Sequence, residues 1–151
     1  MGSPIIELTS ADFSRCGAIW DIAGQPELAA CFRHELEAGI RRTWLWTEAG
    51  RDVAEISLVY DMNDAEYTVP GKRAYVSHLV VAPAYRRQGI GRLLLQHVCG
   101  MSRSLGYTEL SVGVDLDNYP ALRLYVSEGF DRILRVDRDE GGVYAKLLRQ
   151  L

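Results

Sequence analysis

The chain of 151 residues is poor in cysteine and has no long apolar run. Its three cysteines, Cys16, Cys31 and Cys99, are odd in number and far apart, which fits neither a disulfide framework nor a Cys-x-x-Cys metal site. We therefore expect reduced thiols and a cytoplasmic protein. No stretch approaches the roughly 20 apolar residues that a membrane-spanning helix needs. The segment Met1–Pro4 has neither a charged nor an apolar signal region, so the sequence predicts no secretory signal and no membrane partner.

Histidine is also scarce, and His34, His78 and His97 lie without the spacing of metal ligands, so we expect no metal site. The charge is nearly balanced, with 17 basic and 20 acidic residues and a net charge of −3. Such a balance argues against a nucleic-acid partner. Apolar residues make up 48% and charged residues 25%, which excludes a disordered chain. One domain spanning residues 1–151 is the expectation at this length.

Hydrophobic periodicity predicts the element order β-α-α-β-β-β-α-β-α-β-β, a mixed α/β fold with a sheet of six to seven strands and about four helices. The strands are expected at Ile5–Leu8, Thr43–Thr47, Val53–Tyr60, Ala74–Val81, Leu110–Val114, Phe130–Val136 and Val143–Leu148. The helices are expected at Phe13–Trp20 after the N-cap Ser10, at Pro26–Leu36 before Gly39, at Ile90–Leu105 and at Asn118–Ser127. The strand–helix–strand unit from Ala74 to Val114 predicts a parallel pair with a right-handed crossover.

The most informative segment joins the strand end at Val81 to the helix that starts at Ile90. It contains Gly89 and Gly91 and is flanked by arginines, including Arg86. Glycines let the backbone approach an anion, and the first turn of a helix offers N–H groups at the positive end of the helix dipole. The segment therefore predicts a phosphate or pyrophosphate site.

Two common phosphate-binding motifs do not fit this segment. A Walker A loop needs Gly-x-x-x-x-Gly-Lys-Ser/Thr, and the chain has no such string. The dinucleotide fingerprint Gly-x-Gly-x-x-Gly fails at its third glycine, which is Leu94. Both absences count against a nucleotide-binding protein, and Gly89-x-Gly91 alone is a weak signal.

A longer pattern is more specific. Arg86-x-x-Gly89-x-Gly91 follows a Val-x-Pro strand end, and further along come Asn118-x-x-Ala121-x-x-Leu-Tyr125 and then Gly-Phe130. The two motifs in this order, together with the element order over nearly the whole chain, resemble the GNAT superfamily of N-acetyltransferases. The resemblance implies a sheet whose two central parallel strands splay apart.

The resemblance also implies acetyl-CoA as the cofactor, with CoA as the product. By this analogy the pyrophosphate lies on the turn and the pantetheine arm pairs with the preceding strand. Asn118 and Tyr125 match the family positions that flank the sulfur end. The implied cofactor-binding residues are Leu79, Val80, Val81, Arg86, Arg87, Gln88, Gly89, Ile90, Gly91, Arg92, Asn118 and Tyr125.

The implied reaction is a direct attack of an amine on the thioester in a ternary complex. Tyr125 is the expected acid for the departing thiolate, because a tyrosine hydroxyl can give a proton. His78 is the candidate base, although it lies on the opposite alternation of its strand from Leu79 and Val81. Other candidate bases remain open: Glu55, Asp61, Glu109 and Asp115.

The acceptor is expected to be a primary amine of a small molecule or a peptide. Family members that modify protein N-termini often carry a Glu on the strand before the Asn, and here Gly113 stands five residues before Asn118. Acetylation of a protein N-terminus or a lysine therefore stays as an alternative, as does a silent acyl-CoA-binding module. The acidic loops favour a cationic acceptor. The aromatic candidates for an acceptor pocket are Trp20, Trp44, Trp46, Tyr60, Tyr67 and Tyr75. An exposed terminal strand leaves a homodimer open.

Overall fold

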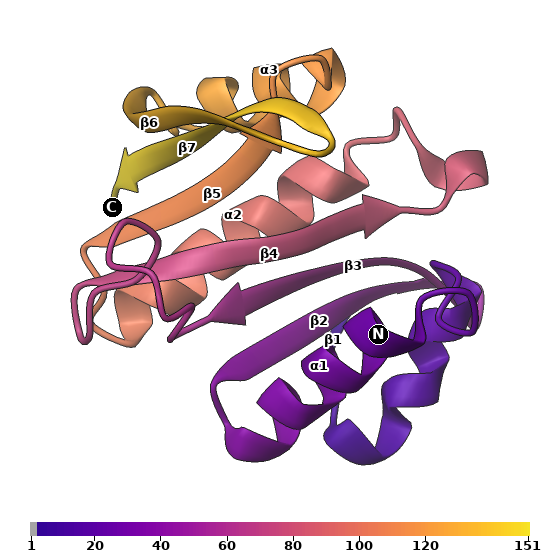
Figure 1. Ribbon diagram of the computed structural model, residues 1–151. Helices are drawn as coiled ribbons and strands as arrows, with labels where there is room; N and C mark the ends of the chain where they lie inside the picture. The colour runs from indigo at the N-terminus through magenta and orange to yellow at the C-terminus, as the bar shows by residue number, and fades with distance from the viewer. Residues whose placement is uncertain (1–2) are drawn as a thin grey trace. The chain divides into compact units, whose positions relative to one another are not determined.

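The computed structural model describes residues 3–151. Part of the segment Met1–Pro4, on which the expectation of no secretory signal rests, lies outside the described residues. Seven strands form one sheet in the order β1-β2-β3-β4-β5-β7-β6 (Figure 1). They are β1 (Ile5–Glu7), β2 (Arg41–Glu48), β3 (Arg51–Val59), β4 (Arg73–Val81), β5 (Glu109–Asp115), β6 (Arg132–Asp139) and β7 (Gly142–Gln150). The helical segments are η1 (Ser10–Ala18), α1 (Pro26–Ala38), η2 (Pro83–Tyr85), α2 (Ile90–Ser104) and α3 (Tyr119–Ser127).

The expected mixed α/β class and the order of its main elements are confirmed, and the structure adds the short η2 segment. Within residues 3–151 no helix combines the length and the apolar character that crossing a membrane requires. The chain divides into two compact units. Unit 1 comprises Met1–Val59 with Ser77–Val98, and unit 2 comprises Tyr60–Val76 with Cys99–Leu151. Strand β4 and helix α2 therefore each pass from one unit to the other.

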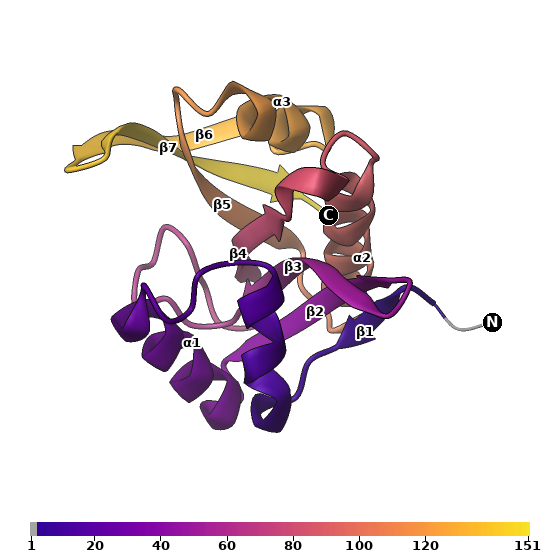
Figure 2. The same cartoon turned by 90° about the vertical axis from the view of Figure 1, so that its right-hand side faces the viewer.

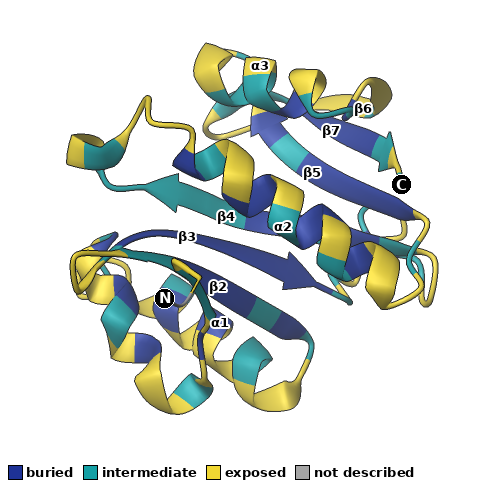
Figure 3. Ribbon diagram, turned by 180° about the vertical axis from the view of Figure 1, so that it is seen from behind, coloured by how far each residue is buried: buried dark blue, intermediate teal, exposed yellow. Residues whose placement is uncertain are grey.

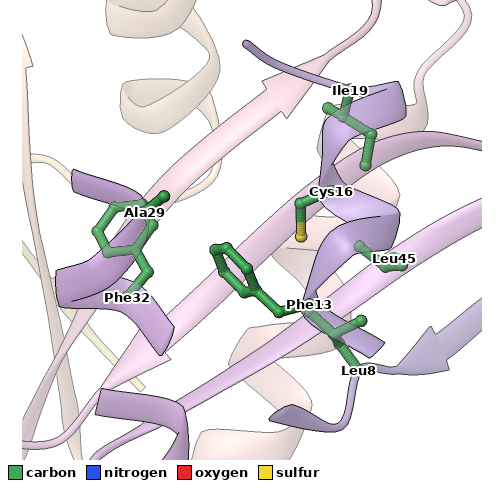
Figure 4. Packing of buried hydrophobic residues seen from close by; sticks show 7 residues of the cluster. All are labelled: Leu8, Phe13, Cys16, Ile19, Ala29, Phe32 and Leu45. Carbon is green, nitrogen blue, oxygen red and sulfur yellow. The ribbon is translucent and has the colours of Figure 1, made fainter. Parts of the chain in front are cut away.

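Unit 1 is built on the antiparallel strands β1, β2 and β3. Figure 2 shows η1 and α1 together on one side of these strands. Leu45 of β2 packs into the apolar cluster beneath them, whereas its neighbour Trp44 meets His97 of α2 at 5.5 Å between ring centroids. Successive strand residues point to opposite faces, so β2 carries apolar side chains on both. Figure 4 shows the cluster, which consists of Leu8, Phe13, Cys16, Ile19, Ala29, Phe32 and Leu45.

The first helical segment differs from the expectation. It is a 3₁₀ helix with a break at Asp12, where φ is −102° and ψ is 16°. The N-cap is Thr9 rather than Ser10, and the Thr9 hydroxyl donates to the Asp12 carboxylate instead of capping a backbone N–H. By contrast α1 begins at Pro26, and Gly39 follows its last residue, Ala38, as the C-cap, so the predicted start and stop signals are confirmed. Gly39 has a φ of +77°, a conformation that glycine adopts without steric cost.

Unit 2 contains β5, β7 and β6, which pair antiparallel in that order. The first residues of β4, Arg73–Tyr75, pair in parallel with Glu109–Ser111 of β5, so the predicted parallel pair is confirmed. Figure 3 shows β5 buried along most of its length. The β6–β7 hairpin turn is shorter than the predicted turn from Asp137 to Gly142, because β6 continues to Asp139. The Asp139 carboxylate accepts a hydrogen bond from Gly141 N–H at 2.8 Å, which stabilises the tight turn.

Candidate active site

The predicted anion-binding turn lies in unit 1 between η2 and α2. Arg87 and Gly89 both have positive φ, at 65° and 81°. The first helical hydrogen bond runs from Leu93 N–H to the Gly89 carbonyl at 3.1 Å, so the N–H groups that follow Gly89 belong to the first turn. Such groups have no acceptor inside the helix and carry its positive dipole end. The turn therefore has the backbone geometry of an anion site.

Some side chains around this turn anchor it to the protein, and others are exposed to solvent. Arg86 Nε donates to the Val81 carbonyl at 2.9 Å, which ties the turn to the end of β4. Ile90 is buried, so its backbone alone is available to a ligand. Arg87 and Gln88 are exposed. A Cβ added at Gly89 would meet no atom within 4 Å, so the space above this residue is open.

His78 lies in the same unit, on β4, with a φ of +55°. This conformation is uncommon for a residue that is not glycine and stores local strain. The imidazole is half-buried and meets Trp20 and Phe32, with ring centroids 4.8 and 5.1 Å away. Its Nδ1 lies 3.4 Å from Oε2 of Glu55 on β3. The structure thus brings together two of the candidate bases, His78 and Glu55.

Glu55 and Arg41 are buried polar residues in this part of unit 1. Within residues 3–151, Oε1 of Glu55 and Nη1 of Arg41 have no hydrogen-bond partner. The remaining donors of Arg41 bind Glu35 Oε1 at 3.2 Å and Ser77 Oγ at 3.0 Å, and its guanidinium lies 3.8 Å from the centre of the Phe32 ring. An unpartnered buried oxygen is costly unless a ligand or water satisfies it.

The predicted acid lies in unit 2. Tyr125 is 7% exposed, and its ring meets the edge of Phe130 at 5.7 Å. Burial raises the pKa of Tyr125 above its usual range, and Tyr75 adds to the effect. Its hydroxyl therefore stays protonated at neutral pH. Asn118 is the N-cap of α3, and its side-chain oxygen accepts from Ala121 N–H at 3.4 Å.

The other candidate bases have different surroundings. Glu109 forms an ion pair with Arg73 at 3.2 Å and accepts from Gln150 at 3.0 Å. Burial raises the pKa of Glu109, but these partners outweigh burial and hold it below its usual value. Asp61 accepts a hydrogen bond from Asn63 N–H in its own loop. Asp115 lines a cavity.

That cavity lies in unit 2 and has a volume of about 320 Å³, in the range of ligand pockets. It is lined by Tyr67, Tyr75, Gly113, Val114, Asp115, Asp139 and Tyr144. Sequence reasoning named Tyr67 and Tyr75 as aromatic candidates but missed Tyr144. Tyr144 reaches the cavity because it pairs with Asp115 across β5 and β7. This pairing depends on strand register, so no signal in the sequence alone could have identified Tyr144. Trp44, another aromatic candidate, is instead 3% exposed.

A protein-family model described as "Acetyltransferase (GNAT) family" matches residues 4–130 of the chain. The streptothricin acetyltransferase of Streptomyces lavendulae is 32% identical over 89 residues, which cover 59% of this chain and 44% of that protein. The chain spans about half the length of the curated relatives it matches.

Two solved structures share the fold. The ribosomal-protein-S18-alanine N-acetyltransferase of Escherichia coli has a TM-score of 0.76 and 21% identity, covering 97% of this chain and 92% of that one. The PaiA N-acetyltransferase of Thermoplasma acidophilum, solved in complex with coenzyme A, has a TM-score of 0.69 and 16% identity over the full length of both chains.

Proposed function

Because the chain belongs to the acetyltransferase (GNAT) family, we propose that it transfers the acetyl group of acetyl-CoA to a primary amine of a small molecule or a peptide. The observation that carries the proposal is the turn before α2, which joins positive-φ residues, open space at Gly89 and a helix N-terminus. The streptothricin acetyltransferase and the structure solved with coenzyme A support the same reaction and donor.

The turn fits the pyrophosphate of the donor. First-turn N–H groups from Gly89 to Gly91 donate to phosphate oxygens, and Arg87 and Arg92 add positive charge. The backbone of Leu79–Val81 pairs with the amides of the pantetheine arm as a neighbouring strand would. The family resemblance assigns Asn118 and Tyr125 of unit 2 to the sulfur end of the donor.

During transfer, a bond forms between the amine nitrogen and the acetyl carbon, and the bond from that carbon to sulfur breaks. Backbone N–H groups near Val81 stabilise the negative charge that develops on the carbonyl oxygen. Tyr125 donates a hydrogen bond to the departing sulfur. Because burial raises the pKa of Tyr125, its hydroxyl stabilises the thiolate by hydrogen bonding more readily than by complete proton transfer.

His78 accepts the proton that the attacking amine loses. Its Nδ1 faces Glu55, so an Nδ1–H bond to this carboxylate leaves Nε2 as the basic nitrogen. Glu55 is a positioning residue in this scheme, since it fixes the tautomer of His78 and stabilises the imidazolium. The strained backbone of His78 supports the same interpretation, because such strain gathers at functional positions.

The proposal is tested with the purified chain, acetyl-CoA and a panel of primary amines, read by release of free CoA thiol. The panel contains an alkyl diamine, an aminoglycoside, a peptide with a free N-terminus and a blocked peptide with one lysine. Two controls give the background: the protein with acetyl-CoA but without an acceptor, and the protein alone. The second is needed because the exposed thiol of Cys31 also reacts with a thiol reagent. Transfer to the first three supports the proposal. Transfer to the lysine peptide alone supports the protein-lysine alternative, and CoA binding without transfer supports the silent module.

A further inference from the structure

One face of the sheet in unit 2 gathers aromatic and acidic side chains. Paired residues of antiparallel strands point to the same face, and the pairs Gly113–Lys146 and Asp115–Tyr144 are two residues apart on each strand. Tyr75 of β4 pairs with Ser111, which has the same alternation as Gly113 and Asp115. The alternation of three strands therefore places the rings of Tyr75 and Tyr144 and the Asp115 carboxylate around one cavity.

Tyr67 closes the cavity from the loop between β3 and β4. Its carbonyl accepts from Ser111 Oγ, and its ring lies 4.5 Å from that of Tyr75, centroid to centroid. Lys146 Nζ lies 4.6 Å from the centre of the same ring and is ion-paired with Asp64 at 2.9 Å and Glu66 at 3.0 Å. These contacts fix the position of the Tyr67 ring.

Gly113 makes room for Tyr67. A Cβ at position 113 would lie 2.5 Å from the Tyr67 hydroxyl and 3.4 Å from its Cζ. The first separation is shorter than real Cβ contacts, so a side chain there would displace a ring that Lys146 and Tyr75 hold in place. Because Gly113 has no side chain, the Tyr67 ring can take its position in the cavity wall.

The charge of the lining has one sign. Its acidic side chains are Asp115 and Asp139, and within the described chain the lining contains no lysine or arginine. The positive charge of nearby Lys146 is already paired with two carboxylates. Aromatic faces and carboxylates together attract a cation, especially an alkylammonium whose methylenes also contact the rings.

We infer that this cavity binds one ammonium group of an acceptor that is a diamine, and that the second amino group of the same molecule is the one acetylated. The inference rests on the proposed function and deepens it. An amine held by carboxylates is kept protonated and has no lone pair for attack, so the nucleophile is a different nitrogen. The Asn118 N–H donates to the Asp115 carbonyl at 3.0 Å, so the cavity lies beside the start of α3, the helix that carries the proposed acid Tyr125.

The atoms of this reaction balance within the proposed transfer. The free amino group, in its neutral form, forms a bond to the acetyl carbon, and the carbon–sulfur bond breaks with its electron pair going to sulfur. The nitrogen loses one proton to the base, and the products are the monoacetyl diamine and CoA. The anchored ammonium keeps its proton throughout.

The first test is an NMR titration of the full chain, labelled with carbon-13 at its tyrosine rings, in low salt and without acetyl-CoA. The probe is 1,5-diaminopentane, and 1,5-pentanediol is its uncharged counterpart. We expect the diamine to shift the ring signals of Tyr67, Tyr75 and Tyr144 and to leave Tyr119 unmoved, because Tyr119 is 63% exposed on α3 and lies outside the cavity. Equal shifts with the diol, or no shifts with the diamine, would overturn the inference.

The second test removes the charges singly. Asp115→Asn and Asp139→Asn keep the side-chain shape, and each should weaken diamine binding by roughly fivefold. Asp131→Asn is the matched control, since Asp131 is exposed and outside the cavity. It should bind like the unaltered chain. Unchanged affinity in both cavity variants contradicts the inference.

The third test uses the fit between Gly113 and Tyr67. Gly113→Ala should weaken diamine binding by about tenfold, because its Cβ pushes the Tyr67 ring into the cavity. Combining it with Tyr67→Phe removes the clashing hydroxyl and should restore the affinity of Tyr67→Phe alone to within about twofold. Gly100→Ala is the control, because a Cβ there meets no atom within 4 Å. A double variant as weak as Gly113→Ala would contradict the proposed fit.

These outcomes separate the two proposals. If the diamine binds at the tyrosines but no amine is acetylated, the proposed function fails and the cation site stands. If amines are acetylated and both aspartate variants keep the KM for the diamine, the proposed function stands and the cavity is not the acceptor site.

Discussion

The candidate ligand sites of the two units differ in charge. In unit 1 the turn before α2 presents arginines and helix N–H groups, whereas in unit 2 the cavity presents aspartates and tyrosine rings. The net charge of −3 is a sum over the whole chain and does not reveal this local difference. A bisubstrate enzyme with an anionic donor and a cationic acceptor benefits from such a division, since each site attracts one substrate and repels the other.

Individual ion pairs also differ in burial, and one pair from each unit shows the contrast. In unit 1 the Arg41 side chain is 2% exposed in its pair with Glu35. In unit 2 the Arg135 side chain is 52% exposed in its pair with Glu66. Losing one partner of a buried pair strands an uncompensated charge, whereas water replaces a lost surface partner. Substitutions at buried and at exposed charged residues should therefore have different consequences.

The largest effect is expected at Tyr125 of unit 2. Tyr125→Phe keeps the edge contact with Phe130 but removes the hydrogen bond to the departing sulfur, and we expect kcat to fall by about 10²–10³-fold with little change in the KM for acetyl-CoA. The measurement is steady-state kinetics on the folded variant. Tyr119→Phe is the control, since Tyr119 is 63% exposed on the same helix. Unchanged kcat in Tyr125→Phe would mean that water, and not Tyr125, stabilises the departing sulfur.

The next effect concerns the anion site of unit 1. Gly89→Glu places a carboxylate where pyrophosphate should bind, and we expect CoA affinity to fall by about a hundredfold. Gly89→Ala imposes the same left-handed backbone strain without the charge and should cost only a few-fold. Calorimetric titration with CoA measures both. Equal losses would mean that backbone shape, and not charge, governs binding.

A smaller effect tests the buried ion pair. Arg41→Met leaves the Glu35 carboxylate without its buried partner and Ser77 without its donor, and should lower the free energy of unfolding by about 2 kcal/mol. Urea denaturation gives the value. Arg33→Met removes an exposed guanidinium that lies 5.0 Å from the Phe13 ring and should cost about 0.5 kcal/mol or less. Similar losses for the two variants would contradict the contrast in burial.

The smallest effect compares the acid sensitivity of the two units. Hydrogen bonds from Lys146 lower the pKa values of Asp64 and Glu66, as the hydrogen bond from Arg15 lowers that of Asp52 in unit 1. Carboxyls with lowered pKa values stabilise the folded chain above their unfolded pKa values near 4, and this stabilisation is lost as the pH falls through the folded values.

Lys146→Gln should therefore lower Tm by about 2–4 °C at pH 7 and show a shallower fall in Tm below pH 5 than the unaltered chain. Thermal melts from pH 7 to pH 3 measure this. Arg15→Gln tests the matching pair in unit 1. If Tm falls equally steeply with pH in Lys146→Gln and in the unaltered chain, Lys146 does not contribute to the loss of stability at low pH.

The local elements of the fold were predictable from the sequence because their signals lie within a few residues. Gly39 ends α1, and Gly89 precedes α2, as their positions beside helical periodicity indicate. The exception is η1, whose apolar spacing fits an α-helix. The Thr9 hydroxyl donates to the Asp12 carboxylate, so no side chain caps the first turn, and the segment is a 3₁₀ helix with a break at Asp12.

By itself, the sequence determined the element order, the glycine turn and the motifs that carry Asn118 and Tyr125. The tertiary structure decided which of these groups acquire neighbours. Glu55 and His78 are 23 residues apart, and Tyr67 reaches Gly113 only because its loop packs on β5. Such contacts depend on strand register and on loop closure over long separations. A local pattern carries no record of them, which is why the shape and charge of the cavity emerged only from the folded chain.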